Sequence, residues 1–111
     1  MTIKETAKAL GCELLHDSFK DTQIEGAYTS DLLSDVIANA KSGGALITIQ
    51  AHKNTIAVAS LATISAIIIC NKRPIPDDML EAAKEEGVAL LRSEENQFTV
   101  SGRLYAMLHA A

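Results

Sequence analysis

Tryptophan is absent from this chain, and aromatic residues make up only 4% of it although 48% of its residues are hydrophobic. The core is therefore expected to consist mainly of Ala, Ile, Leu and Val side chains. A chain of 111 residues is long enough to bury one such core and too short for two. We predict a single domain over residues 1–111.

Runs of positive charge are also missing. The sequence has 10 Lys and Arg residues against 14 Asp and Glu, a formal net charge of −4, and its longest positive run is Lys72-Arg73. A nucleic-acid groove or a patch for an anionic membrane surface requires clustered cations. Neither nucleic acid nor a membrane is expected as a partner.

Cysteine and histidine are too few and too scattered for a disulfide framework or a metal site. Cys12 and Cys70 lie far apart, each in an apolar stretch, which favours a reduced, cytoplasmic protein. His16, His52 and His109 show no metal-ligand spacing with each other or with the cysteines. We predict no metal and no cofactor.

Targeting and membrane signals are lacking as well. Residues 2–11 are amphipathic and carry three charges, unlike a secretory signal. The segment between Lys53 and Lys72 is free of charge, but it contains several Ser, Thr and Asn residues and divides into a helix and a strand. A span needs about twenty mostly apolar residues. The expected location is the cytoplasm.

The most informative stretch runs from Gly43 to Arg73. Two short apolar runs, Leu46–Ile49 and Ile67–Cys70, flank an apolar helical segment at Ile56–Ala62, which is expected to be covered on two sides. A strand, a crossover helix and a second strand without polar alternation indicate a parallel sheet buried on both faces. We predict that both runs are inner strands.

Shorter patterns on either side of this stretch predict repeated strand–helix units. Helices are expected at residues 2–10, 32–40, 77–86 and 98–108, and short strands at 12–15, 24–28 and 88–91, with residues 16–23 as a surface loop. The predicted fold class is α/β, with three layers, a mostly parallel sheet and helices on both of its faces.

Helix ends are predicted from short polar residues and glycines. Thr2 and Glu5 form a capping box, and Gly11 and Gly87 end their helices. The helix at 32–40 is expected to be capped by Thr29 or Ser30, with Asp31 in its first turn, and the helical segment at Ile56–Ala62 by Asn54 or Thr55. Asp78 and Glu81 are expected to form a capping box in the helix at 77–86. In the last helix, Phe98 is expected to face inward.

Polar and cationic residues follow each predicted strand. Ligands of parallel α/β sheets bind at the carboxyl ends of the strands, where helix N-termini converge. The candidate ligand-binding residues are Ser30, Asp31, Gln50, His52, Lys53, Asn54, Asn71, Lys72 and Arg73. Their cations, amides and hydroxyls would suit a nucleotide or another phosphorylated small molecule. The alternative is that they are helix caps and solvated loop charges.

No catalytic motif is present. Ser30, Asp31 and His52 can be drawn as a triad, but no Gly-x-Ser-x-Gly elbow surrounds a serine. Gly43-Gly44 lacks the Lys and Ser or Thr of a phosphate-binding loop and precedes a strand. We predict no catalytic residues and no enzyme activity.

Three pieces of sequence carry a family resemblance: Ser30-Asp31-Leu32-Leu33-Ser34-Asp35, Ile47-Thr48-Ile49-Gln50-Ala51-His52 and Gly102-Arg103-Leu104-Tyr105. With them the chain resembles the DRTGG-domain family, in particular its small stand-alone members. It is similar to the domain that accompanies CBS domains in regulatory pyrophosphatases and to the N-terminal domain of HPr kinase/phosphorylase. The resemblance implies a dimeric α/β regulatory domain.

The signature letters of that family are replaced in this chain. The Asp and Arg would fall at Ala51 and His52, and the Thr-Gly-Gly at Cys70, Asn71 and Lys72. A kinase activity does not follow from the resemblance, because no phosphate-binding loop is present.

The predicted function is that of a non-catalytic regulatory module. It would form a homodimer and sense a nucleotide or other phosphorylated small molecule at strand-end loops near the dimer interface. The alternative is a pure dimerisation or protein-interaction domain without a small-molecule ligand. The high hydrophobic content of so small a chain leaves apolar surface for a protein partner.

Overall fold

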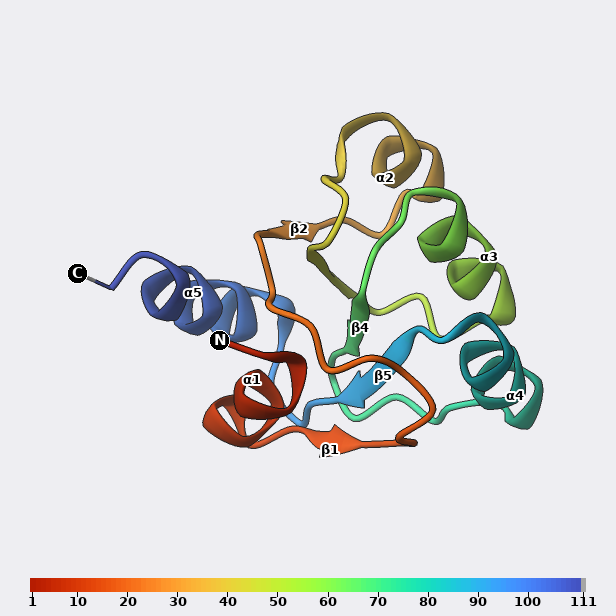
Figure 1. Ribbon diagram of the computed structural model, residues 1–111, viewed down its shortest axis with the longest axis horizontal. Helices are drawn as coiled ribbons and strands as arrows, with labels where there is room; N and C mark the ends of the chain where they lie inside the picture. Colours follow the sequence, from red (N-terminus) through yellow and green to blue (C-terminus); the bar gives the residue numbers. More distant parts are fainter. Residues whose placement is uncertain (111) are drawn as a thin grey trace.

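A five-stranded sheet organises the structure, a computed structural model that describes residues 1–110 (Figure 1). In chain order the elements are α1 (Ile3–Leu10), β1 (Glu13–Leu14), β2 (Ala27–Thr29), α2 (Leu33–Asn39), β3 (Ala45–Thr48), α3 (Lys53–Leu61), β4 (Ala66–Ile69), α4 (Asp77–Glu86), β5 (Ala89–Arg92) and α5 (Gln97–Leu108).

The strands lie in the order β1-β5-β4-β3-β2, with β2 to β5 parallel and β1 antiparallel to β5. Leu46 of β3 is paired with Ile67 of β4, which is paired in turn with Leu90 of β5. The two apolar runs therefore form inner strands, as predicted. The predicted α/β class with a mostly parallel sheet is confirmed.

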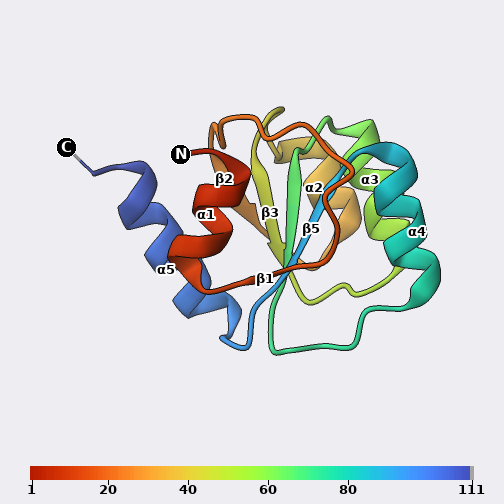
Figure 2. The same cartoon turned by 60° about the horizontal axis from the view of Figure 1, so that its bottom comes forward.

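Helices cover both faces of the sheet, and each face has its own apolar cluster (Figure 2). The helices α1 and α5 pack over the face that carries Ile47 and Ile68, whereas α2, α3 and α4 pack over the face that carries Leu46 and Ile67. Successive side chains of a strand point to opposite faces. Continuous apolar runs are thus required where both faces are covered.

Both glycine stops and the first capping box are confirmed. The Thr2 hydroxyl accepts a hydrogen bond from the Glu5 N–H (3.2 Å), and the Glu5 carboxylate accepts one from the Thr2 N–H (2.8 Å). Gly11 and Gly87 follow α1 and α4 with φ of 68°, in the left-handed region that glycine adopts without a Cβ clash.

The other predicted caps are wrong. The helix α2 follows Leu32 and α4 follows Pro76, neither with a side-chain cap, and His52 rather than Asn54 or Thr55 caps α3. The Thr55 hydroxyl instead donates to the Gln50 carbonyl at 2.7 Å. Before α2, the Asp31 carboxylate is instead taken up by donors from the end of β3, and the Ser30 hydroxyl accepts from the Leu32 N–H.

Three expectations of burial are also corrected. Phe98 is 87% exposed, because it lies about 200° around α5 from the buried Val100. The helix α3 is not covered on two sides, since its Leu61 is 71% exposed. His16 is buried although its loop was expected at the surface: its Nδ1 accepts from the Ser18 N–H (2.9 Å), and its Nε2 donates to the Val88 carbonyl (2.8 Å).

Both cysteines are free thiols in the cluster beneath α1 and α5. Burial raises the pKa of Cys12 to about 11 and that of Cys70 to about 12. Among residues 1–110, no helix combines the length and the apolar character that crossing a membrane requires.

The two thiols should react slowly in the native state. The thiolate is the nucleophile, and a pKa of about 11 at Cys12 makes the thiolate fraction at pH 8 about 200-fold smaller than that of free cysteine, so the reaction with Ellman's reagent should be slower than that of free cysteine. The rate should rise with pH as the thiolate fraction grows. Both thiols should react at the ordinary rate in urea, and a native rate equal to that of free cysteine would contradict the burial of the thiols.

Candidate functional site

The predicted site residues all lie at one end of the sheet. Because β2 to β5 are parallel, the loops that follow them leave the same edge (Figure 2). Ser30 and Asp31 follow β2, Gln50 to Asn54 span the β3–α3 junction, and Asn71 to Arg73 follow β4. The structure thus gathers the candidate residues as their positions after parallel strands predicted.

Asp31 holds three of these segments together. One oxygen of its carboxylate, Oδ1, accepts hydrogen bonds from the Thr48 hydroxyl (2.9 Å), the Ile49 N–H (2.9 Å) and the Gln97 amide (3.0 Å). The Asp31 carbonyl also accepts from the Gln50 side-chain amide at 2.9 Å. Asp31 was expected in the first turn of α2, but it precedes this helix. Its carboxylate instead joins the ends of β2 and β3 to the start of α5.

The triad that can be drawn from the sequence does not form. The Ser30 hydroxyl accepts from the Leu32 N–H (3.2 Å), and the His52 Nδ1 accepts from the Asn54 N–H (3.1 Å) at the start of α3. The Asp31 carboxylate is occupied by other donors. None of the hydrogen bonds in the described part of the chain joins Ser30, Asp31 and His52 to one another through their side chains.

The turn after β4 has an unusual backbone. Asn71 and Lys72 are both left-handed, with φ of 61° and 49°. Their N–H groups donate to the Glu95 carbonyl (2.9 Å) and the Ser93 carbonyl (2.8 Å). These are the positions where the family resemblance places two glycines, which adopt this region without strain. The chain keeps the turn at a steric cost of about 1–2 kcal/mol per ordinary residue.

The cationic side chains at this end of the sheet differ in whether they are free to bind an anion. The Lys72 ammonium is 3.2 Å from the Glu94 carboxylate in an exposed ion pair. Lys53 and Arg73 are exposed, and no ion pair of theirs occurs within residues 1–110. Lys53 is also the first residue of α3, where unbonded N–H groups and the positive end of the helix dipole favour an anion.

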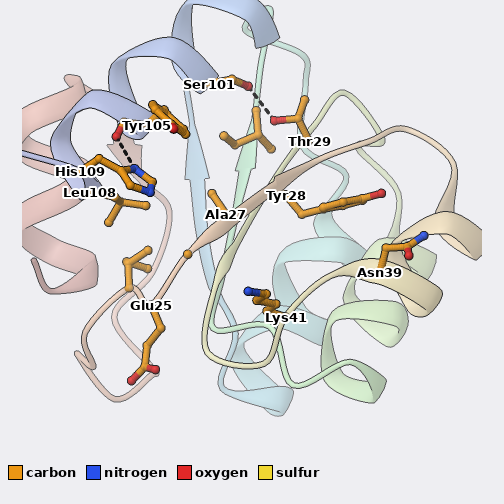
Figure 3. Close-up of a pocket in the computed structure, with 13 residues that line it drawn as sticks. Glu25, Ala27, Tyr28, Thr29, Asn39, Lys41, Ser101, Tyr105, Leu108 and His109 are labelled. Carbon is orange, nitrogen blue, oxygen red and sulfur yellow. Dashed lines mark hydrogen bonds between the residues drawn. The ribbon is translucent and has the colours of Figure 1, made fainter.

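A separate hollow lies along the free edge of β2, with a volume of about 590 Å³ (Figure 3). Tyr105 and His109 stack beside it with ring centroids 4.1 Å apart, and the Thr29 and Ser101 hydroxyls are 2.6 Å apart. Figure 3 shows the α5 side chains on one side of β2 and Tyr28 on the other. None of the predicted site residues lines this hollow.

This second region was not predicted, because β2 and α5 are distant in sequence. One available signal was the spacing of Tyr105 and His109, which places two rings on the same face of a helix. No group of three or more His, Cys, Asp or Glu side chains placed to hold a metal ion occurs among the described residues.

A family model of the DRTGG domain matches residues 5–107. The chain belongs to the DRTGG-domain family. The predicted family is therefore confirmed, and it covers nearly the whole of the described structure although the signature letters are replaced.

Two known proteins resemble this DRTGG domain. HPr kinase/phosphorylase of Streptococcus uberis is 44% identical over 45 residues, which are 40% of this chain and 14% of that enzyme. A solved structure has a TM-score of 0.73 at 13% identity, and the likeness covers 93% of this chain and 45% of that one. It contains the CBS and DRTGG domains of the regulatory region of Clostridium perfringens pyrophosphatase, complexed with its activator, diadenosine tetraphosphate. The chain spans less than half of either relative.

Replacing Asp31 should loosen the carboxyl end of the sheet. In Asp31→Ala the Ile49 N–H and the Gln97 amide lose their acceptor, so the free energy of unfolding should fall by about 1–3 kcal/mol. Urea unfolding measures this change. Asp17→Ala is the matched control and should change the free energy of unfolding little, because the Asp17 side chain is exposed and makes no hydrogen bond within residues 1–110. Equal stability of the two variants would contradict the structural role of Asp31.

Replacing Lys72 by glycine should stabilise the domain despite the loss of an ion pair. Glycine removes the strain at φ 49°, and an exposed ion pair contributes little. The expected net gain is about 0.5–1 kcal/mol, since glycine also adds entropy to the unfolded chain. Arg73→Gly, at a position without positive φ, should instead be destabilising. A loss of stability in Lys72→Gly would show that the left-handed turn is not strained.

Proposed function

We propose that this DRTGG domain is a non-catalytic, cytoplasmic regulatory module that forms a homodimer, with residues 1–111 as one domain. Its ligand is a nucleotide or another phosphorylated small molecule, held by the loops at the carboxyl end of the sheet. Family membership and the likeness to a regulatory region that binds a dinucleotide support this proposal.

The class of ligand is inferred from two cations, Lys53 and Arg73, which form no ion pair within residues 1–110 and follow the neighbouring strands β3 and β4. Lys53 adds its charge to the N-terminus of this helix, and Arg73 lies in the neighbouring loop of the same sheet edge. A phosphate group can accept hydrogen bonds from the helix N–H groups and from both side chains. Lys72 is a weaker candidate, because its ammonium lies 3.2 Å from the Glu94 carboxylate, whose negative charge would repel an incoming anion.

A regulatory role is supported by the way this edge is tied to the rest of the domain. The Asp31 carboxylate contacts the ends of β2 and β3 and, through Gln97, the first residue of α5. A ligand that displaces the β3–α3 loop therefore acts on α5 through one shared acceptor. Each side chain of the drawn triad, Ser30, Asp31 and His52, accepts hydrogen bonds from other groups of the chain. In this proposal these residues position the loops and take part in no chemical step.

Pure dimerisation is the second candidate, and two observations favour it. The N–H groups of Asn71 and Lys72 donate to carbonyls of the β5–α5 loop, so they are not available to an anion. Phe98 and Tyr105 expose large apolar surfaces on α5. This candidate requires no ligand at the carboxyl end of the sheet.

A thermal-shift panel of adenine nucleotides, diadenosine polyphosphates and sugar phosphates separates the two candidates. A ligand at a hundred times its dissociation constant adds about 2.7 kcal/mol to the free energy of unfolding. We expect one member of the panel to raise the Tm of the native domain, and the double variant Lys53→Ala/Arg73→Ala to lose this shift while keeping its own Tm.

Two controls locate the ligand. Lys84→Ala, on the exposed side of α4, should leave the shift unchanged. Loss of the shift in Lys41→Ala instead of the double variant would place the ligand in the hollow along β2, which Lys41 lines. No shift with any compound would leave dimerisation as the function.

A further inference from the structure

One face of α5 carries an exposed apolar stripe. Phe98 is 87% exposed and Tyr105 is 66% exposed, and Gly102 lies between them, four residues after the first and three before the second. Residues at these spacings share one face of a helix. The opposite face, with Val100 and Leu104, is buried against the sheet. The helix therefore has a second apolar face, whose contact inside the chain is the stacking of Tyr105 on the His109 ring.

Gly102 has no explanation within the chain. A glycine inside a helix costs about 1 kcal/mol relative to alanine. A Cβ atom built at Gly102 meets nothing within 4 Å, and its backbone is not left-handed. Neither crowding nor backbone strain in this chain requires glycine there. The remaining physical use of a missing side chain on a helix surface is the close approach of another backbone.

We infer that this stripe is the interface with a second copy of the chain, which deepens the proposed homodimer. The stripe is self-complementary, because the rings of Phe98 and Tyr105 lie at nearly equal distances on either side of Gly102, which has no side chain. Two antiparallel α5 helices related by a two-fold axis beside Gly102 place Phe98 of each copy against Tyr105 of the other. In such an isologous contact, each pair of residues occurs twice.

The size and the charge of this surface fit a second copy. Phe98 is 87% exposed and Tyr105 is 66% exposed, so of the roughly 150–250 Å² that an aromatic side chain buries, the four rings of two copies can supply about 450–750 Å². An interface of roughly 1,200 Å² therefore also requires contacts of neighbouring residues on α5. Beside the stripe, Arg103 and Glu95 are already paired with each other at 2.7 Å. Neither of these two side chains therefore offers an unpaired charge to an oppositely charged partner.

The position of α5 allows this approach. The C-terminal half of the helix lies at one extremity of the molecule, away from α2, α3 and α4 (Figures 1 and 2). A second α5 can therefore lie along it without meeting the helices on the opposite face of the sheet.

Sedimentation equilibrium of the full chain over micromolar concentrations tests the interface. The unmodified chain should form dimers. Phe98→Ala and Tyr105→Ala should each weaken association by about 30-fold or more, the effect of a residue central to an interface. Because both side chains are exposed, the variants should keep the far-ultraviolet circular dichroism of the folded chain.

Gly102→Ala gives the sharpest test, because its two expected effects have opposite signs. Alanine should raise the Tm of the monomer, since it favours the helix. It should also weaken the dimer, since its methyl group separates the helices. Leu61→Ala, an exposed apolar residue on α3, is the matched control and should leave association unchanged.

The outcomes separate this inference from the proposed function. Dimers that persist in Phe98→Ala, Tyr105→Ala and Gly102→Ala would overturn the α5 interface while leaving the homodimer in place. A chain that stays monomeric throughout would overturn both. Binding of vesicles or of an apolar peptide to the stripe of a monomeric chain would assign this face to another occupant. That result would likewise overturn the inference.

Discussion

The structure depends on one constraint, the burial of both faces of β3 and β4. Every residue of these two strands is buried, and the side chains are almost all apolar. Such strands are stable only when helices cover the sheet on both sides. The placement of α1 and α5 on one face and of the other three helices on the opposite face follows from this need, and so does the convergence of the strand-end loops at one edge.

How much the sequence predicts depends on the range of the interactions involved. Buried runs, the Thr2 capping box and the glycines at helix ends are local patterns, and they located most elements correctly. Strand order and the caps of α2, α3 and α4 were not predictable in the same way. Asp31 shows why: as a local residue it suits the first turn of a helix, but Thr48, Ile49 and Gln97 all donate to it in the folded chain.

The candidate site follows the same division. Parallel topology brings the predicted residues to one edge, so their proximity was predictable from the order of the elements alone. Whether these residues are free to bind a ligand could not be predicted in this way, because the partners of Lys72 and of the neighbouring backbone N–H groups come from the β5–α5 loop. The hollow beside β2 was missed altogether. Its two hydroxyls, on Thr29 and Ser101, lie 72 residues apart in the sequence and meet only through the fold.

The left-handed turn at Asn71 and Lys72 has a consequence for how such domains diverge. The two N–H groups of the turn donate to main-chain carbonyls, which every residue has whatever its side chain. A residue other than glycine can therefore occupy either position of this loop at a steric cost, which is smaller for asparagine than for most other residues. A signature defined by such glycines marks a backbone shape. Its glycines are replaced in this chain, and the left-handed turn is still present.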